Sequence, residues 1–295
     1  MCKALVVLVC LVVLAGCGAA QPAAGSTAVD VVAGENFWGS LATELGGSKV
    51  SVQSVVTDPN ADPHEYETSA ADARAFAEAN LVILNGAGYD TWGQKLIDAN
   101  PSTGRQVLDV AALLGKRQGD NPHFWYSPTY VARVADKITA EYKAIDSADA
   151  SYFDQKRAQV TTNLQPFIDE VANIRAKYAG TPIGSTESVF VYMADALGLD
   201  LTTPPEFMNA VAEGNDPPAS AVVKLQDQIS SRSIKVLVYN TQTTTAVTTN
   251  IRSLAASHQI PSVGVSETIQ PQGLNFQDWQ LKQLQSLQAA LQAAS

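Results

Sequence analysis

Two short segments of the chain place a histidine in the same local setting. They read DPHEY at residues 62–66 and NPHFW at residues 121–125, and they contain two of the only three histidines among 295 residues. Imidazole is the commonest metal-binding side chain near neutral pH, and the preceding proline restricts the backbone that presents the ring. Either segment alone would be an ordinary turn, but together they predict that His64 and His123 share a divided metal site. The third histidine, His258, lies near the C-terminal end of a predicted helix, where the helix dipole favours it, and is not assigned to the site.

The remaining ligands of such a site must be oxygens. All three cysteines lie within the first 17 residues, so the rest of the chain has no thiol for a disulfide or a cysteine-rich zinc site. Glu187, in GSTESVF at residues 184–190, and Glu267, in VSET at residues 265–268, both follow predicted strands, where ligand sites of α/β proteins lie. Acidic residues are also favoured in the first turn of a helix, so each glutamate taken alone has an equally good structural explanation.

The N-terminal end is predicted to be a secretion signal, residues 1–16. Lys3 precedes an apolar run at residues 4–15, which is shorter than the roughly 20 residues needed to span a bilayer. The run ends in LAGC, which resembles the bacterial lipobox; in lipoproteins of that kind the cysteine, here Cys17, is lipidated and begins the mature chain. Ordinary cleavage with an incidental Cys17 is the alternative. Residues 17–28 are uncharged at every position from Gly18 onward and are expected to form a flexible tether.

The charge and the length of the rest of the chain limit its expected partners and its expected number of lobes. Removing residues 1–16 removes one lysine and leaves 18 basic and 29 acidic side chains, a net charge of −11. Such a charge disfavours nucleic acid and anionic membrane surfaces as partners, whereas it mildly attracts cations. The 279 residues that remain of the 295 exceed a typical single domain and suggest two lobes.

Alternating strand and helix patterns predict an α/β fold of two lobes, residues 29–146 and 180–295, each a mainly parallel sheet flanked by helices. The predicted strands are 29–33, 50–56, 81–84, 107–109, 182–184, 234–239 and 262–265. The predicted helices outside the connection between the lobes are 37–45, 69–80, 92–100, 190–197, 219–231, 243–257 and 276–294.

A long interdomain helix at residues 147–179 is expected to join the lobes. If it is continuous from residue 150 to residue 178, it is about 43 Å long at 1.5 Å per residue. Pro166 should kink it or end one segment. Such a connection would act as a stiff hinge and permit only limited movement of the lobes.

Taken together, these motifs resemble the metal-binding lipoproteins of ABC importers for zinc, manganese or iron, the cluster A-I solute-binding proteins, over the whole body from about Val29 onward. The resemblance implies that the metal ligands are His64, His123, Glu187 and Glu267. Glutamate as the third ligand is commoner among manganese or iron binders of the family. The chain departs from the commoner pattern in three places: the fourth ligand is glutamate rather than aspartate, the second motif begins with asparagine, and the histidine-rich loop of many zinc-dedicated members is absent. Candidates for residues around the ligands are Tyr66, Trp125, Asn209 and Asn240.

The resemblance also implies a function. The protein would be held at the extracytoplasmic face of the bacterial cell membrane through acylated Cys17, carry Mn, Zn or Fe as cargo, deliver it to an ABC permease, act as a monomer and catalyse no reaction. Two alternatives remain open: a surface adhesin or interaction lipoprotein with a structural metal, and a metal-dependent hydrolase. The hydrolase is disfavoured because no second histidine follows His64 in the His-Glu-x-x-His spacing, and because a catalytic zinc usually keeps an open position for water.

Overall fold

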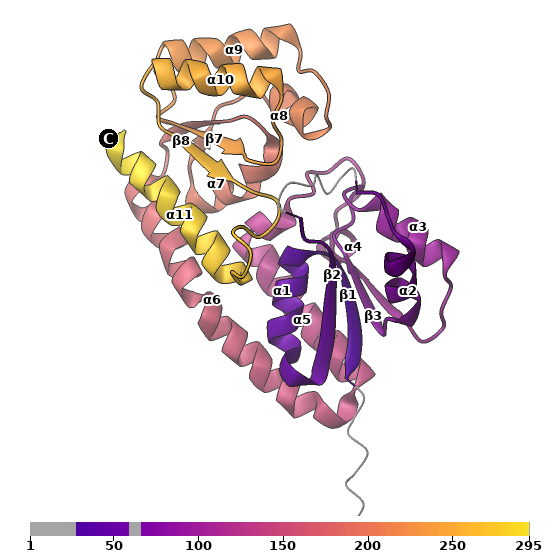
Figure 1. Cartoon of the computed structure of the whole chain (residues 1–295). Coiled ribbons are helices and arrows are strands. Elements are labelled where there is room, and N and C mark those ends of the chain that lie inside the picture. The colour runs from indigo at the N-terminus through magenta and orange to yellow at the C-terminus, as the bar shows by residue number, and fades with distance from the viewer. Residues whose placement is uncertain (1–27, 59–65, 295) are drawn as a thin grey trace, which may run out of the picture.

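The computed structural model describes residues 28–58 and 66–294, which form two α/β lobes (Figure 1). The predicted secretion signal, Cys17, almost all of the tether and His64 lie outside the described residues. None of the helices that the structure describes combines the length and the apolar character needed to cross a membrane. The two-lobe α/β fold predicted from the sequence is confirmed.

The first lobe contains a four-stranded sheet in the order β2-β1-β3-β4, with every pair parallel. Its strands are β1 Val29–Glu35, β2 Val50–Val56, β3 Leu81–Leu84 and β4 Gln106–Asp109. Its helices are α1 Asn36–Gly46, α2 Ala70–Glu78, α3 Thr91–Ala99 and α4 Val110–Leu114. All four residues of β3 are buried, as expected for a central parallel strand covered on both faces.

The second lobe repeats this arrangement. Its sheet has the order β6-β5-β7-β8, again entirely parallel. Its strands are β5 Pro182–Ser185, β6 Asp200–Leu201, β7 Val236–Asn240 and β8 Ser262–Val265. Its helices are α7 Val191–Leu197, α8 Pro205–Ala212, α9 Ala219–Ser230, α10 Ala246–Ser257 and α11 Phe276–Ala293. In each sheet the strand that comes first in the chain, β1 or β5, lies inside the sheet. The second strand pairs with one side of it and the third strand with the other side. This reversal creates a switch point at the carboxyl ends of the strands.

Two helices connect the sheets: α5 Pro128–Ile145, and α6 Ala150–Tyr178, which has 29 residues. Helix α6 runs beside both lobes and packs along α11 (Figure 1). It continues through Pro166, so of the two effects expected of this proline, a kink or the end of a helical segment, the second is wrong. Leu164 and Phe167 are both buried next to it, and this packing holds the helix together despite the backbone hydrogen bond that proline removes.

Among residues 28–58 and 66–294, the buried apolar side chains form one large and two small clusters. The large one, here called the inner core, takes side chains from both sheets and from α1, α5, α6, α7 and α11. The first outer core lies between the first sheet and α2 and α3, and the second lies between the second sheet and α8, α9 and α10. The lobes therefore share one core on their inner side and have separate cores on their outer sides.

Aromatic rings from the second histidine motif lie at the centre of the inner core. Trp125 stacks on Phe37 of α1, with ring centroids 3.9 Å apart and an interplanar angle of 23°. Its neighbour Tyr126 meets Phe190 and Trp279 of the second lobe edge-on, at 5.9 and 6.1 Å. The segment that carries His123 therefore also forms part of the contact between the lobes.

Candidate metal centre

Three of the four predicted ligands meet between the lobes. His123 Nε2 lies 3.6 Å from Glu187 Oε1 and 3.8 Å from Glu267 Oε2, and one ligand atom from each of the three residues lies within 4.8 Å of the others. All three side chains are buried. The fourth predicted ligand, His64, falls outside the described residues. His258 is the C-cap residue of α10 and is not part of this group.

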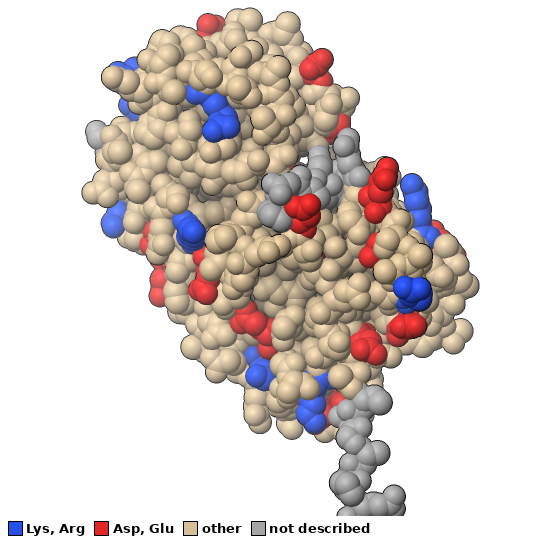
Figure 2. All heavy atoms as spheres, viewed as in Figure 1, with Lys and Arg blue, Asp and Glu red and all other residues tan. Residues whose placement is uncertain are grey.

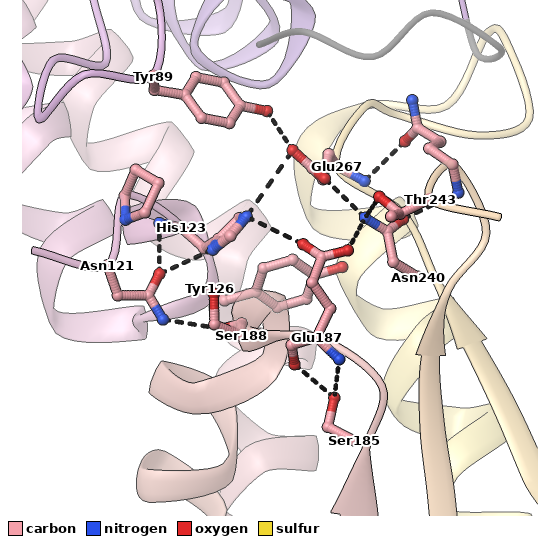
Figure 3. A network of polar contacts seen from close by, with 12 residues as sticks. Tyr89, Asn121, His123, Tyr126, Ser185, Glu187, Ser188, Asn240, Thr243 and Glu267 are labelled. Atoms are coloured by element: carbon pink, nitrogen blue, oxygen red, sulfur yellow. Dashed lines mark hydrogen bonds and ion pairs between the residues drawn. The ribbon is translucent and has the colours of Figure 1, made fainter. Parts of the chain in front are cut away.

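The two sheets bring these residues together because their carboxyl ends face each other. Glu187 comes two residues after β5, and Glu267 comes two residues after β8. His123 lies in the first lobe, directly before the 3₁₀ turn Phe124–Tyr126. Figure 3 shows the three side chains pointing toward one another from separate segments. This is the position at which open parallel sheets bind ligands.

Asn121 fixes the tautomer of His123. Its side-chain oxygen accepts a hydrogen bond from the backbone N–H of His123 at 3.0 Å and lies 2.7 Å from Nδ1. Its amide nitrogen donates to the carbonyl of Ser188 at 2.8 Å, which orients the amide with its oxygen toward the ring. An amide oxygen can only accept, so Nδ1 carries a proton, and Nε2, which faces the two carboxylates, is the ring nitrogen left for a metal ion.

The turn before His123 is held by Asn85, a fully buried residue directly after β3. Its amide nitrogen donates to the carbonyl of Pro122 at 2.9 Å, and its oxygen accepts from Trp38 Nε1 at 3.0 Å. Asn85 was not predicted from the sequence as part of the site. Its position after a buried strand was the available signal, because polar side chains at that end of a parallel sheet tend to surround the ligand site.

Glu187 is positioned through its backbone and its side chain. The Ser185 hydroxyl donates to the Glu187 carbonyl at 2.7 Å, which fixes the turn that follows β5. The Asn240 side-chain amide donates to Glu187 Oε2 at 2.7 Å. Glu187 Oε1 is thereby directed toward His123.

Glu267 is held from both lobes. Gln242 Oε1 accepts from the backbone N–H groups of Glu267 and Thr268, at 2.7 and 2.9 Å. From the first lobe, the Tyr89 hydroxyl donates to Glu267 Oε2 at 2.6 Å (Figure 3). Tyr89 and Gln242 were not identified from the sequence, where only their positions shortly after β3 and β7 set them apart.

A glycine turn presents Tyr89 to the second lobe. The Tyr89 N–H donates to the carbonyl of Gly86 at 3.0 Å, and Gly86 has a φ of +76°, which favours glycine. A Cβ atom at Gly86 would lie 2.3 Å from Asp109 Oδ1. A larger residue there would displace the turn, and Tyr89 with it.

The four candidates for residues around the ligands have different positions. Asn240 contacts a ligand directly, the Trp125 ring meets the His123 ring edge-on at 5.3 Å, and Asn209 lines a neighbouring cavity. Tyr66 instead donates to Asp72 at 3.1 Å and packs against Trp92 in the first outer core.

Two further carboxyl groups are buried near the ligands. Burial raises the pKa of Glu35, the last residue of β1, well above its usual range, and the adjacent Asp90 raises it further. Burial also raises the pKa of Asp90 to about 6, although the backbone N–H groups of Gly86 and Asn85 donate to it and favour its ionised form. Burial and the neighbouring Asp90 carboxyl thus both favour the neutral form of Glu35.

A cavity of about 560 Å³ adjoins the site and is lined by both lobes. Its walls include Tyr89, Asn121, His123, Ser188, Asn209 and Glu213. On the face of the molecule shown in Figure 2, Lys and Arg are scattered and form no large basic patch. The cavity thus lies beside His123, whose side chain is itself fully buried.

Comparisons with known proteins identify relatives of this chain. The family model described as "Zinc-uptake complex component A periplasmic" (ZnuA) matches residues 31–290. The manganese-binding lipoprotein MntA of Halalkalibacterium halodurans is 24% identical over 80% of this chain and 80% of its own length. The high-affinity zinc uptake system protein ZnuA of Bacillus subtilis is 21% identical over 78% of this chain and 77% of its own length.

A solved structure shows the same fold. The solute-binding protein FpvC of Pseudomonas aeruginosa, in complex with Mn²⁺, superposes with a TM-score of 0.75 at 18% identity, over 91% of this chain and all of that one. The likeness at this identity concerns the fold alone. Since the family match itself runs through both lobes, this chain belongs to the ZnuA family of metal-binding solute-binding proteins.

Proposed function

We propose that this protein captures one divalent transition metal ion between its lobes and delivers it to an ABC permease. The proposed ligands are His64, His123, Glu187 and Glu267, and the proposed cargo is Mn²⁺, Zn²⁺ or Fe²⁺. The protein would act as a monomer without catalytic activity. Lipidated Cys17 would hold it at the extracytoplasmic face of the membrane.

The convergence of one imidazole and two carboxylates in a buried space is the observation that carries this proposal. Two carboxylates at this separation repel each other in a medium that screens poorly. A divalent cation would neutralise them, so that no net charge stays buried. Asn121 occupies Nδ1 of His123, so the ring directs Nε2 toward the two carboxylates and the position of the ion.

Metal stoichiometry tests the proposal. The purified protein is stripped with a chelator, offered Mn²⁺, Zn²⁺ or Fe²⁺, and analysed for bound metal. We expect one ion per chain in the wild type. His64→Ala and His123→Ala should each lose this binding, since each removes a ligand of the same ion. His258→Ala is the matched control, because His258 ends α10, and should bind as the wild type does.

The ligand assignment is wrong if His64→Ala and His123→Ala both still bind one ion with unchanged affinity. A monomer that binds no ion under any of these conditions would contradict metal capture itself. Metal analysis of the protein isolated from its own cells then identifies the ion that it carries there.

A further inference from the structure

One side-chain amide lies between the two carboxylates of the site. Asn240, the last residue of β7, is 2% exposed. Its nitrogen donates to Glu187 Oε2 at 2.7 Å and to Glu267 Oε1 at 2.6 Å. Its oxygen accepts from the backbone N–H of Gln242 at 2.9 Å, which turns the two amide hydrogens toward the carboxylates (Figure 3).

The amide and the imidazole contact different oxygens of each carboxylate. Glu187 Oε2 and Glu267 Oε1 meet Asn240, whereas Glu187 Oε1 and Glu267 Oε2 are the atoms nearest to His123 Nε2. Each glutamate thus directs one oxygen toward the amide and the other toward the position that a metal ion would occupy. The amide holds both carboxylates in this orientation at once.

We infer that Asn240 determines the metal specificity of the site by limiting each carboxylate to one metal-bound oxygen. This inference rests on the proposed function. A carboxylate that bound the ion through both oxygens would have to rotate its outer oxygen away from the amide and leave a buried N–H without its charged acceptor. The two glutamates therefore supply two oxygens to the ion instead of as many as four.

The number of oxygens matters because divalent ions differ in the coordination that they accept. Zn²⁺ has no geometric preference from its d electrons and is readily bound by four ligands in a tetrahedral arrangement. Mn²⁺ favours oxygen-rich, six-coordinate sites. By withholding two carboxylate oxygens, Asn240 favours an ion of low coordination number. It acts through the glutamates as a positioning residue.

Co²⁺ is a suitable probe, since its visible absorption is strong in four-coordinate sites and weak in six-coordinate ones. The test compares the wild type with Asn240→Leu, which is similar in size but donates no hydrogen bond, and with Asn240→Ala. Thr243→Val is the control: Thr243 Oγ1 lies 3.0 Å from the same amide nitrogen, but its loss leaves both bonds to the carboxylates in place. Competition titrations of Zn²⁺ against Mn²⁺ are measured on the same four proteins.

We expect the wild type and Thr243→Val to give the strong four-coordinate spectrum. Asn240→Leu and Asn240→Ala should give the weaker spectrum of a higher coordination number, and their preference for Zn²⁺ over Mn²⁺ should fall by about tenfold or more, the range seen when residues that orient metal ligands are changed. A six-coordinate spectrum in the wild type would overturn the inference, even if neither Asn240 variant folds. Spectra and preferences that are unchanged in folded Asn240 variants would also overturn it while leaving metal capture intact. A wild type that binds no ion would overturn both.

Discussion

At the scale of single residues, His123 is oriented by a neutral amide. In Asn121 the side-chain oxygen contacts both the backbone nitrogen and Nδ1 of the histidine, while the amide nitrogen reaches the second lobe at Ser188. A carboxylate at this position could make the first two contacts but would face the Ser188 carbonyl with an acceptor instead of a donor. Asparagine at this position, where aspartate is commoner in the family, therefore satisfies all three of these contacts.

Asn121→Leu should weaken metal binding without changing its stoichiometry. The substitution removes the acceptor that keeps the proton on Nδ1, so the imidazole must be reoriented when the ion binds. Loss of such a contact typically lowers metal affinity by about 10- to 100-fold, and a competition titration against a chelator of known affinity measures the change. Asn209→Ala, which alters the wall of the same cavity, is the control and should keep the wild-type affinity. Equal affinities for Asn121→Leu and the wild type would show that Asn121 does not orient the ring.

Glu35 provides a second test at this scale, because its raised pKa links stability to pH. In the unfolded chain Glu35 loses its proton near its ordinary pKa of 4.5. In the folded protein its pKa is higher, so Glu35 keeps the proton to a higher pH. Unfolding then releases a proton, and the contribution of Glu35 to the free energy of unfolding falls as the pH rises above that value.

Glu35→Gln should therefore gain stability relative to the wild type as the pH rises from 5 to 7. Glutamine keeps the size of the side chain and has no proton to release, so the difference should grow by up to about 1.4 kcal/mol per pH unit. Urea denaturation of both metal-free proteins at several pH values measures it. Stability profiles that run parallel over this range would contradict a protonated Glu35.

At the scale of elements, one face of α1 holds the segment that follows Glu267. Asn36, Ser40 and Glu44 are four residues apart and so lie on one face of the helix. Asn36 Oδ1 accepts from the N–H of Ile269 at 3.0 Å, and Ser40 Oγ accepts from the N–H of Phe276 at 3.0 Å. Glu44 Oε2 accepts from the side-chain amide of Gln277 at 3.1 Å. The first helix of the first lobe thus helps to place a proposed ligand of the second.

Substitutions along this face should separate stability from affinity. Asn36→Ala and Ser40→Ala each remove the acceptor of one backbone N–H and should each cost about 1–3 kcal/mol of unfolding free energy. Only Asn36→Ala should also weaken metal binding, because Ile269 lies two residues from Glu267 whereas Phe276 begins α11. Calorimetric titration and thermal unfolding of both variants test this. Equal affinities in the two variants would indicate that α1 does not position Glu267.

The strands and helices differ in how well they could be predicted from the sequence. The strands 50–56, 81–84 and 262–265 were predicted to the residue, because the continuous apolar run of 81–84 and the recurring valines of the other two are local signals. Helix α8 begins within the pair Pro204-Pro205, which looks like a turn, and strand β6 has only two residues. Both were missed, since packing in the second lobe determines them.

The metal centre likewise contains residues that a local sequence pattern indicates and residues that only a long-range contact reveals. Three of the proposed ligands could be predicted from the sequence: His123, Glu187 and Glu267. Their side chains can bind a metal ion, and they follow strands or turns. The contact between Tyr89 and Glu267 joins residues 178 positions apart, and no local pattern distinguishes this tyrosine from the other eight. Tyr89 therefore had to be found in the structure, whereas Asn240, which also contacts Glu267, was already a candidate from the sequence.

At the scale of the whole molecule, the lobes are joined by more than a connecting helix. The inner core is continuous from β1 to α11 and includes buried side chains of α6 on the way. Tyr126 links the lobes from within, with its hydroxyl 2.8 Å from the carbonyl of Ser266 and 2.9 Å from Gln283 Oε1. Separating the lobes would expose this core, which matches the limited movement expected for a stiff connection.

The division into inner and outer cores has a consequence for the order in which parts of the molecule open. Val56 and Tyr66, the residues that border segment 57–65 with His64, both pack in the first outer core, which contains far fewer side chains than the inner one. Small cooperative units open at a lower free energy than the global unfolding transition. Amide hydrogens of α2 and α3 should therefore exchange with solvent sooner than those of α1, α5 and α6, as mass spectrometry after deuterium labelling would detect. Uniform protection across all five helices would contradict this. The outer layer of the first lobe could then open while the inner core, and with it the contact between the lobes, stays closed.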